Sequence, residues 1–371
     1  MRWIRRLPQG KDCIAGLTIG WGNVDNSSVR NRMRNSMLLE VEAGMPITAR
    51  DIAAAVGISQ STVSRILSGD GRHRVSAVTR ARVLETAGRL GYHPNAIARS
   101  LRSGRTHCIG LYTTHRYDAR NDFLAEILGG LQHACSAHEL DLLLHIGGRT
   151  SSADGVFNGL RDGRIDGLLL HTSPDDPLVT RLSGSELPVV AVADPLPQLP
   201  SITCADGEGM RLLVDHLWER GHRRFAFVAP ESNLASVERR VVAWKSALRR
   251  HGVPYGGVVI RIPSEEPLGV LEQLRTDGNE PCAVSCWNDR TAYGLLRACL
   301  ESGLRVPNEI AVTGFDGFLD DKLPARHLVT IQCPWANAAA TAVELLLRHI
   351  RGEAVASETC LPVQLVPGDT T

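Results

Sequence analysis

Apolar positions three and four residues apart mark the segment 48–67, and this spacing predicts two short amphipathic helices. Thr48 and Asp51 are placed to form a capping box at the start of the first helix, and Gly57 ends it. Ser59 is placed to cap the second helix. The residues predicted to face inward are Ile52, Ala53, Val56, Val63, Ile66 and Leu67.

The outer face of the second helix is polar near its N-terminus. The residues left on this face are Gln60, Ser61, Thr62, Ser64 and Arg65. Amide and hydroxyl groups can hydrogen-bond base edges, and an arginine can bind the O6 and N7 of a guanine at once. The pattern therefore predicts a helix-turn-helix that reads DNA, with an ordinary small helical hairpin as the alternative.

A third helix is predicted to begin at Ser76, which can cap it, and to end at Gly91. The polar segment 95–102 follows, and helices under about 12 residues are marginal in water. We therefore expect this segment to become helical only when it contacts DNA.

Beyond residue 107 short apolar strands alternate with helical stretches. The predicted strands are 108–112, 141–147, 163–171, 186–194, 222–230, 281–287 and 309–316. Strands separated by helices indicate parallel sheets that are covered on both faces. Because the pattern nearly restarts after Thr203, we expect two doubly wound lobes with a ligand cleft at the carboxyl ends of their strands.

Charge is distributed unevenly along the chain, although the net charge is only +1. Residues 46–105 contain 10 Lys and Arg against 3 Asp and Glu, whereas residues 106–371 contain 24 against 33. A basic N-terminal part on an acidic body is expected when only one end of the molecule meets phosphate.

Other classes of protein find little support in the sequence. None of the nine cysteines forms a CxxC pair, which predicts free thiols in a reducing cytoplasm and neither a metal site nor a cofactor. No apolar run reaches the roughly 18 residues of a membrane span. The motifs GxSxG, GxxxxGK[ST] and HExxH are absent, so we do not expect an enzyme. An exported sugar-binding protein would have no use for residues 46–105.

Motifs in register make the chain similar to the LacI/GalR family of bacterial transcription regulators from about residue 46 to the C-terminus. The headpiece motifs are TVSR at 62–65, Ser76 followed by Thr79 and Arg80, and PN at 94–95 followed by Ala98, Arg99 and Leu101. The body motifs include ERRVVAW at 238–244 and WNDRTAYG at 287–294. The resemblance implies an all-α helix-turn-helix headpiece and an α/β two-lobed effector domain like a periplasmic binding protein.

The resemblance also implies the domain boundaries. Residues 1–45 would be an extension that is disordered, a misassigned start, or a basic arm that adds DNA affinity. Residues 46–93 would be the headpiece and residues 94–105 a hinge helix or linker. The effector-binding and dimerisation domain would be 106–371, with lobe one at about 106–203 and 333–356 and lobe two at about 204–332 and 357–371.

For DNA, the resemblance implies a dimeric repressor on a palindromic double-stranded operator. The implied contacts are Thr48, Ser59, Gln60, Ser61, Thr62, Ser64, Arg65, Ser76, Asn95, Ala98, Arg99 and Leu101. In the family a leucine at the position of Leu101 wedges into the minor groove and kinks the duplex. The alternative for Leu101 is a linker residue that packs on the body.

For the effector, the resemblance implies contacts from Phe123, Asp194, Arg240, Trp244, Trp287, Asp289 and Cys333. Arg240 and Asp289 stand at the family's effector-binding arginine and aspartate, with a salt bridge or helix cap as the alternative. Trp244 and Trp287 can stack on a sugar or pack in the core. Asp194 is displaced by one residue, and Cys333 replaces a frequent glutamine. A sugar or sugar acid is the implied effector, with a purine or nucleoside second.

Overall fold

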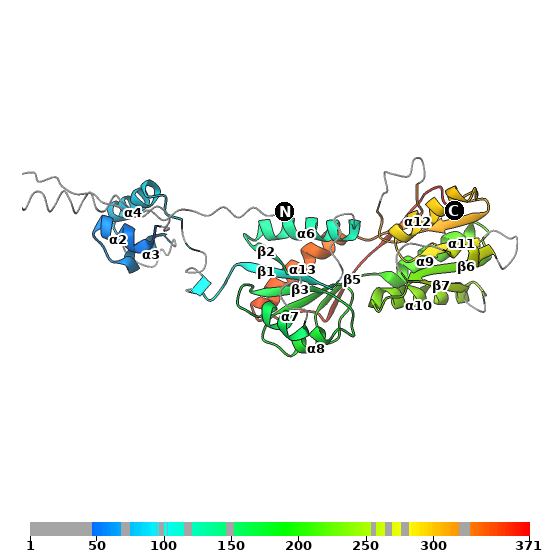
Figure 1. Cartoon of the computed structure of the whole chain (residues 1–371), viewed down its shortest axis with the longest axis horizontal. Coiled ribbons are helices and arrows are strands. Elements are labelled where there is room, and N and C mark those ends of the chain that lie inside the picture. Colours follow the sequence, from blue (N-terminus) through cyan, green and yellow to red (C-terminus); the bar gives the residue numbers. More distant parts are fainter. Residues whose placement is uncertain are drawn as a thin grey trace, which may run out of the picture. The chain divides into compact units, whose positions relative to one another are not determined.

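The computed structural model describes residues 47–67, 75–93, 95, 100–101, 103–114, 121–145, 152–253, 257–263, 269–275, 282–318 and 327–371. The chain forms two compact units, the first ending at Asn95 and the second beginning at Ala96 (Figure 1). The predicted combination of an all-α headpiece and a two-lobed α/β body is confirmed. The predicted extension 1–45 and the hinge residues Ala98 and Arg99 lie outside the described residues.

The headpiece is a three-helix unit around a small apolar core. Its helices are α2 (Ala49–Val56), α3 (Gln60–Leu67) and α4 (Ala77–Arg89). The buried core residues are Ile52, Ala53, Val56, Val63, Ile66, Val83 and Ala87. The helical periodicity therefore located the buried faces of α2 and α3 correctly, with Leu67 half-buried against the same cluster.

Local hydrogen bonds set the ends of these helices as predicted. The Asp51 carboxylate accepts bonds from the Thr48 backbone N–H at 2.8 Å and its hydroxyl at 2.7 Å. Gly57 ends α2 with a φ of 73°, a conformation that glycine adopts without steric cost. The Ser76 hydroxyl accepts a bond from the Thr79 N–H at 3.1 Å. The ends of these helices are therefore specified by residues that lie close together in the sequence.

Lobe one contains a six-stranded parallel sheet in the order β11-β5-β4-β3-β1-β2. The strands are β1 (Cys108–Thr113), β2 (Asp141–His145), β3 (Gly167–His171), β4 (Val189–Ala193), β5 (Ser201–Cys204) and β11 (Glu358–Leu361). Helices α6 (Asp122–Ala137) and α13 (Trp335–Ile350) cover one face, and α7 (Ala153–Leu160) and α8 (Pro177–Ser183) cover the other (Figure 1). Leu169 joins one apolar cluster while its neighbours Leu168 and Leu170 join another, as strand alternation requires.

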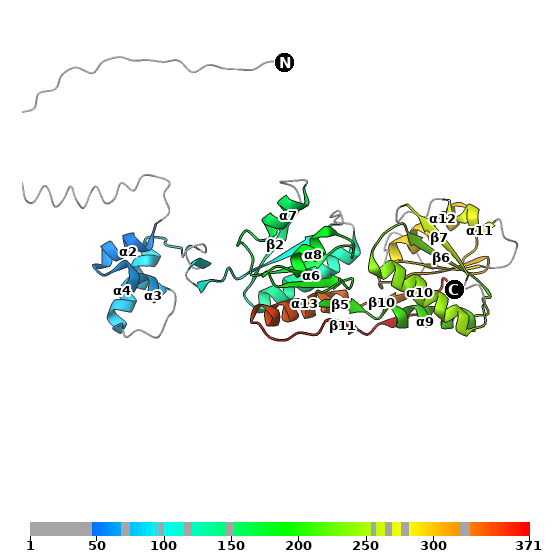
Figure 2. The same cartoon turned by 90° about the horizontal axis from the view of Figure 1, so that it is seen from below.

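Lobe two contains a four-stranded parallel sheet in the order β7-β6-β8-β9. The strands are β6 (Arg224–Pro230), β7 (Val258–Ile262), β8 (Cys282–Cys286) and β9 (Ile310–Thr313). Helices α9 (Asp206–Glu219) and α10 (Ala235–Arg250) lie on one side, and α11 (Val270–Arg275) and α12 (Asp289–Glu301) on the other (Figure 2). Both sheets therefore bury two faces, which explains the nearly continuous apolar strands in the sequence.

The chain crosses between the lobes more than once, and one predicted boundary is wrong. Strand β11 pairs with β5 in lobe one, although 357–371 was predicted to lie in lobe two. Its side chains alternate between exposed and half-buried, so the sequence gives little apolar signal for a strand that pairs Glu358 with Ser201, 157 residues earlier. After it, β12 (Gln364–Val366) pairs antiparallel with β10 (Thr330–Gln332). Among the described helices none has the length and apolar character needed to span a membrane.

Candidate DNA-binding and effector sites

The N-terminal turn of α3 presents a polar surface built around Ser59. The Ser59 hydroxyl accepts a bond from the Thr62 N–H at 3.2 Å and lies 2.8 Å from the Thr62 hydroxyl and 2.9 Å from that of Ser61. Ser59 and Thr62 are thus engaged in starting the helix. Gln60 and Arg65 are exposed, while Thr62 and Ser64 are half-buried. The side chains with the greatest reach on this face are therefore those of Gln60 and Arg65.

Two other predicted DNA contacts, Thr48 and Ser76, are exposed residues at the starts of α2 and α4. Free backbone N–H groups and the helix dipole make such positions suited to phosphate oxygens. Asn95 is exposed at the end of the first unit. These contacts stay predictions.

Leu101, the predicted wedge, has 83% of its surface exposed. The Gly104 N–H donates to the Ser100 carbonyl at 2.8 Å and closes a turn around it. Gly104 has a φ of 69°, which ends this turn. Leu101 is therefore not packed on the body, contrary to the alternative of a packed linker residue.

Arg240 lies in α10 and is only 2% exposed. Its Nε donates to Asp206 Oδ1 at 2.9 Å, one terminal nitrogen donates to the Trp287 carbonyl at 2.6 Å, and the other lies 3.5 Å from Asp316 Oδ1. The guanidinium also stacks 3.7 Å from the centre of the Phe315 ring. Burial alone would lower the pKa of Arg240, but Asp206 and Asp316 outweigh it and raise that pKa. The guanidinium is therefore charged, and each of its three nitrogens contacts an acceptor within the protein.

Asp289 begins α12 and is fully buried. One oxygen accepts bonds from the Gly317 N–H at 2.7 Å and the Phe318 N–H at 2.6 Å, and the other accepts a bond from the Thr330 hydroxyl at 2.5 Å. Burial, followed by the charge of Asp316, raises the pKa of Asp289 well above its usual value. Asp289 therefore links two segments. One is the backbone at Gly317 and Phe318, which follows β9, and the other is β10, which contains Thr330 and leads into the lobe crossover.

Asp194 joins the two lobes from the carboxyl end of β4. It is 2% exposed, and its Oδ1 accepts a bond from the Ser236 N–H in the first turn of α10 at 2.5 Å. Its other oxygen lies 3.5 Å from His171 Nε2. Burial opposes ionisation, yet the bonds from His171 and Ser236 lower the pKa of Asp194. The displaced aspartate is therefore an ionised cap on a helix of the opposite lobe.

Aromatic rings of lobe one lie next to His171, the partner of Asp194. The Phe123 ring centre lies 5.2 Å from that of His171 and 5.0 Å from that of Trp335, which it meets edge to face. The sequence predicted Phe123 but missed His171 and Trp335. Their positions in the sequence could have identified them as site residues, because His171 ends a predicted strand and Trp335 follows Cys333 by two residues.

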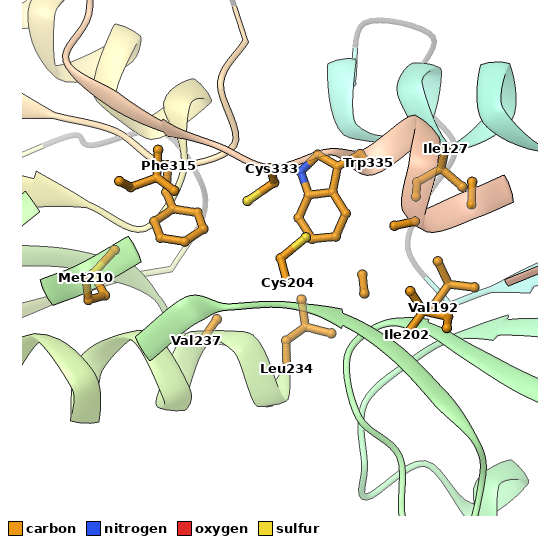
Figure 3. Packing of buried hydrophobic residues seen from close by; sticks show 14 of the residues in the cluster. Ile127, Val192, Ile202, Cys204, Met210, Leu234, Val237, Phe315, Cys333 and Trp335 are labelled. Atoms are coloured by element: carbon orange, nitrogen blue, oxygen red, sulfur yellow. The ribbon is translucent and has the colours of Figure 1, made fainter. Parts of the chain in front are cut away.

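The three remaining predicted effector residues have different surroundings. Trp244 is fully buried in lobe two with its ring 5.4 Å from Phe227, which supports core packing and removes it from the candidate site. Trp287 is half-buried beside Arg240. Cys333 lies near Cys204, Phe315 and Trp335 at the lobe crossover (Figure 3). Burial raises the pKa of the Cys333 thiol, so it is neutral.

Taken by itself, the molecule is a basic three-helix unit joined to a two-lobed α/β body. A model of bacterial regulatory proteins of the lacI family matches residues 48–95, and a periplasmic binding protein-like domain matches residues 214–371. The chain therefore contains a LacI-family helix-turn-helix domain and a periplasmic-binding-protein-like domain, and the relatives it is similar to are LacI/GalR-type repressors, as the sequence motifs predicted.

Individual relatives and solved structures agree with this similarity. Catabolite control protein A of Priestia megaterium is 28% identical over 84% of this chain and 95% of its own length. A lac repressor dimer bound to operator and the anti-inducer ONPF has a TM-score of 0.75 and 26% identity, covering 88% of this chain and 99% of that one. A complex of the regulator CelR with cellobiose has a TM-score of 0.63 and 25% identity, covering 88% of this chain and all of that one.

Proposed function

We propose that this chain is a transcriptional repressor that binds a palindromic operator as a dimer and responds to a small molecule held between its lobes. The observation that carries the proposal is the capped helix α3, with Gln60 exposed at its start and Arg65 exposed in its last turn. A helix of this kind fits the major groove, where amides pair with adenine and arginine with guanine. The operator-bound lac repressor dimer supports the same docking.

The hinge supplies the second DNA contact in this proposal. Leu101 is an exposed apolar side chain that follows the basic headpiece closely in sequence, and inserting it between base pairs would remove it from water. Ala98 and Arg99, which lie outside the described residues, would line the same groove.

The effector would bind at the carboxyl ends of the lobe strands, near Phe123, Asp194 and Trp287. A neutral sugar suits this site better than a sugar acid, because the Arg240 charge is already balanced by Asp206 and Asp316. The buried Nε1 atoms of Trp287 and Trp335 have no hydrogen-bond acceptor among the described residues. A hydroxyl-rich ligand would supply acceptors for them and a ring face for stacking. The cellobiose complex supports the sugar class.

Gln60→Ala and Arg65→Ala test the DNA-reading face. Each variant is expected to lose about 1–3 kcal/mol of binding to its matched operator, since a good base contact is worth that much discrimination. Fluorescence anisotropy on an operator selected from random DNA, and on a shuffled duplex of the same composition, measures the loss. Equal losses on both duplexes for Gln60→Ala would show that α3 does not read bases.

Trp287→Phe tests the effector site, with Trp244→Phe as the matched control. Both indole nitrogens lack an acceptor in the described structure, so neither change removes an internal hydrogen bond. Trp287→Phe should weaken binding of the tightest-binding neutral sugar by roughly five- to tenfold, the worth of about one hydrogen bond. Calorimetry with neutral sugars, sugar acids and nucleosides provides the measurement. Unchanged binding in Trp287→Phe would place the effector elsewhere, and tightest binding by a nucleoside would overturn the sugar class.

A further inference from the structure

We propose that Asp166 is a positioning residue that fixes the place where the linker from the DNA-binding unit enters the body. Half-site spacing in operator binding would then depend on Asp166, although its carboxylate acts through the linker and touches no DNA. The inference rests on the proposed binding of a palindrome by a dimer.

The Asp166 carboxylate receives three hydrogen bonds from the residues that precede β1. Its Oδ1 accepts bonds from the Thr106 N–H at 2.7 Å and the Thr106 hydroxyl at 2.9 Å, and its Oδ2 accepts one from the His107 N–H at 2.9 Å. His107 has a φ of 55°, an unfavourable conformation for a residue with a side chain. Such a conformation persists where surrounding bonds impose it, and here Asp166 supplies them.

The linker end has few other attachments. The Arg105 guanidinium donates to the Ile350 carbonyl at the end of α13 over a long 3.4 Å. Clefts of about 330 and 400 Å³ flank the contact, and both are lined by Arg105, Asp166 and Ile350. The Asp141 N–H also donates to the His107 carbonyl at 2.8 Å. Directional hydrogen bonds, most of them to the Asp166 carboxylate, therefore hold this segment, and not close packing of side chains.

Asp166 is placed so that a movement of lobe one also moves the end of the linker. It directly precedes β3, a fully buried strand that lies beside β1 near the middle of the sheet. The residues it holds directly precede β1. Thr106 and His107, which follow the linker, are thus joined to two central strands, and any rotation of lobe one moves them with it.

Fixed linker ends have a measurable consequence for a dimer. The second headpiece binds its half-site at an effective concentration that is highest when the linker matches the distance to be spanned. Two firmly positioned linkers should therefore reject a palindrome whose half-sites are moved apart. Loosely held linkers should tolerate it.

Asp166→Ala tests this inference in the intact chain, and Asp162→Ala is the matched control. Asp162 lies in the same loop, and its carboxylate accepts bonds from the neighbouring Arg164 instead of the linker. Anisotropy would measure Kd for a palindrome selected from random DNA and for the same duplex with one base pair inserted at its centre. The ratio of the two values does not depend on how much of the sample is folded.

The unmodified chain and Asp162→Ala should show the same large ratio, and Asp166→Ala should lower it by about tenfold. Asp166→Asn, which keeps the side-chain volume and one acceptor, should give an intermediate ratio, so a poorly folding alanine variant does not decide the test. Faster hydrogen exchange at the Thr106 and His107 amides should accompany the loss. An unchanged ratio in both Asp166 variants overturns the inference alone. Failure of the unmodified chain to prefer any palindrome overturns the proposed function as well.

Discussion

Replacing Arg240 with alanine should lower the free energy of unfolding by about 3–5 kcal/mol, the usual cost of removing one partner from a buried ion pair. The guanidinium is 2% exposed and bonds to Asp206, the Trp287 carbonyl and Asp316. Without it, Asp206 stays buried with most of its charge compensation gone. Urea unfolding followed by circular dichroism would measure the change.

Arg239→Ala is the control for this prediction. The side chain of Arg239 is 32% exposed, and it pairs with Asp206 at 3.3 Å and Glu358 at 3.1 Å. Partly solvated pairs contribute little, so its loss should cost no more than about 1 kcal/mol. If the two variants lost equal stability, the account of Arg240 as the centre of a buried ion-pair network would be wrong.

Leu101→Ala should remove most of the operator bend, which wedge side chains of this kind set at about 20–90°. Because Leu101 is 83% exposed, its truncation costs no internal packing, and the free energy of unfolding should stay the same. Sugar binding should also be unaffected. A gel-phasing assay on the selected palindrome measures the bend.

Leu300→Ala serves as the control for this bending experiment. Leu300 is another exposed leucine, 70% accessible, but it lies on α12 in the body. Its truncation should leave the bend intact. An unchanged bend in Leu101→Ala would mean that Leu101 is an ordinary linker residue.

The headpiece was predictable because its determinants are local. Thr48 and Asp51, or Ser76 and Thr79, lie three residues apart, so the sequence contains both partners of each cap side by side. The helical spacing of apolar residues then identifies the buried faces without knowledge of any distant contact.

The body was predictable where strands are fully buried and not where pairing is long-range. Strand β3 is an apolar run that can only be a covered strand, whereas β11 is polar and gains its place from β5. Strand β5 has four residues, too few for its pattern to stand out. The lobe boundary was misplaced for this reason.

In the candidate site, too, local motifs were visible in the sequence and long-range contacts were not. Arg240 and Asp289 were found through their motifs, but their contacts with Asp206, Asp316 and Thr330 join segments far apart in sequence. Such contacts depend on the folded sheets, so the sequence could not show that both side chains already have partners within the protein. The available signal for Asp206 and Asp316 was that each lies shortly after the end of a strand, β5 and β9 respectively.

Selection of bound duplexes from random-sequence DNA by the intact chain tests the central claim most directly. The account predicts enrichment of one two-fold symmetric sequence, bound by a single dimer with a Kd of about 10⁻⁸–10⁻¹¹ M at physiological salt. Binding of that sequence should weaken steeply as salt rises. Retention of all sequences alike, or of none, would contradict it.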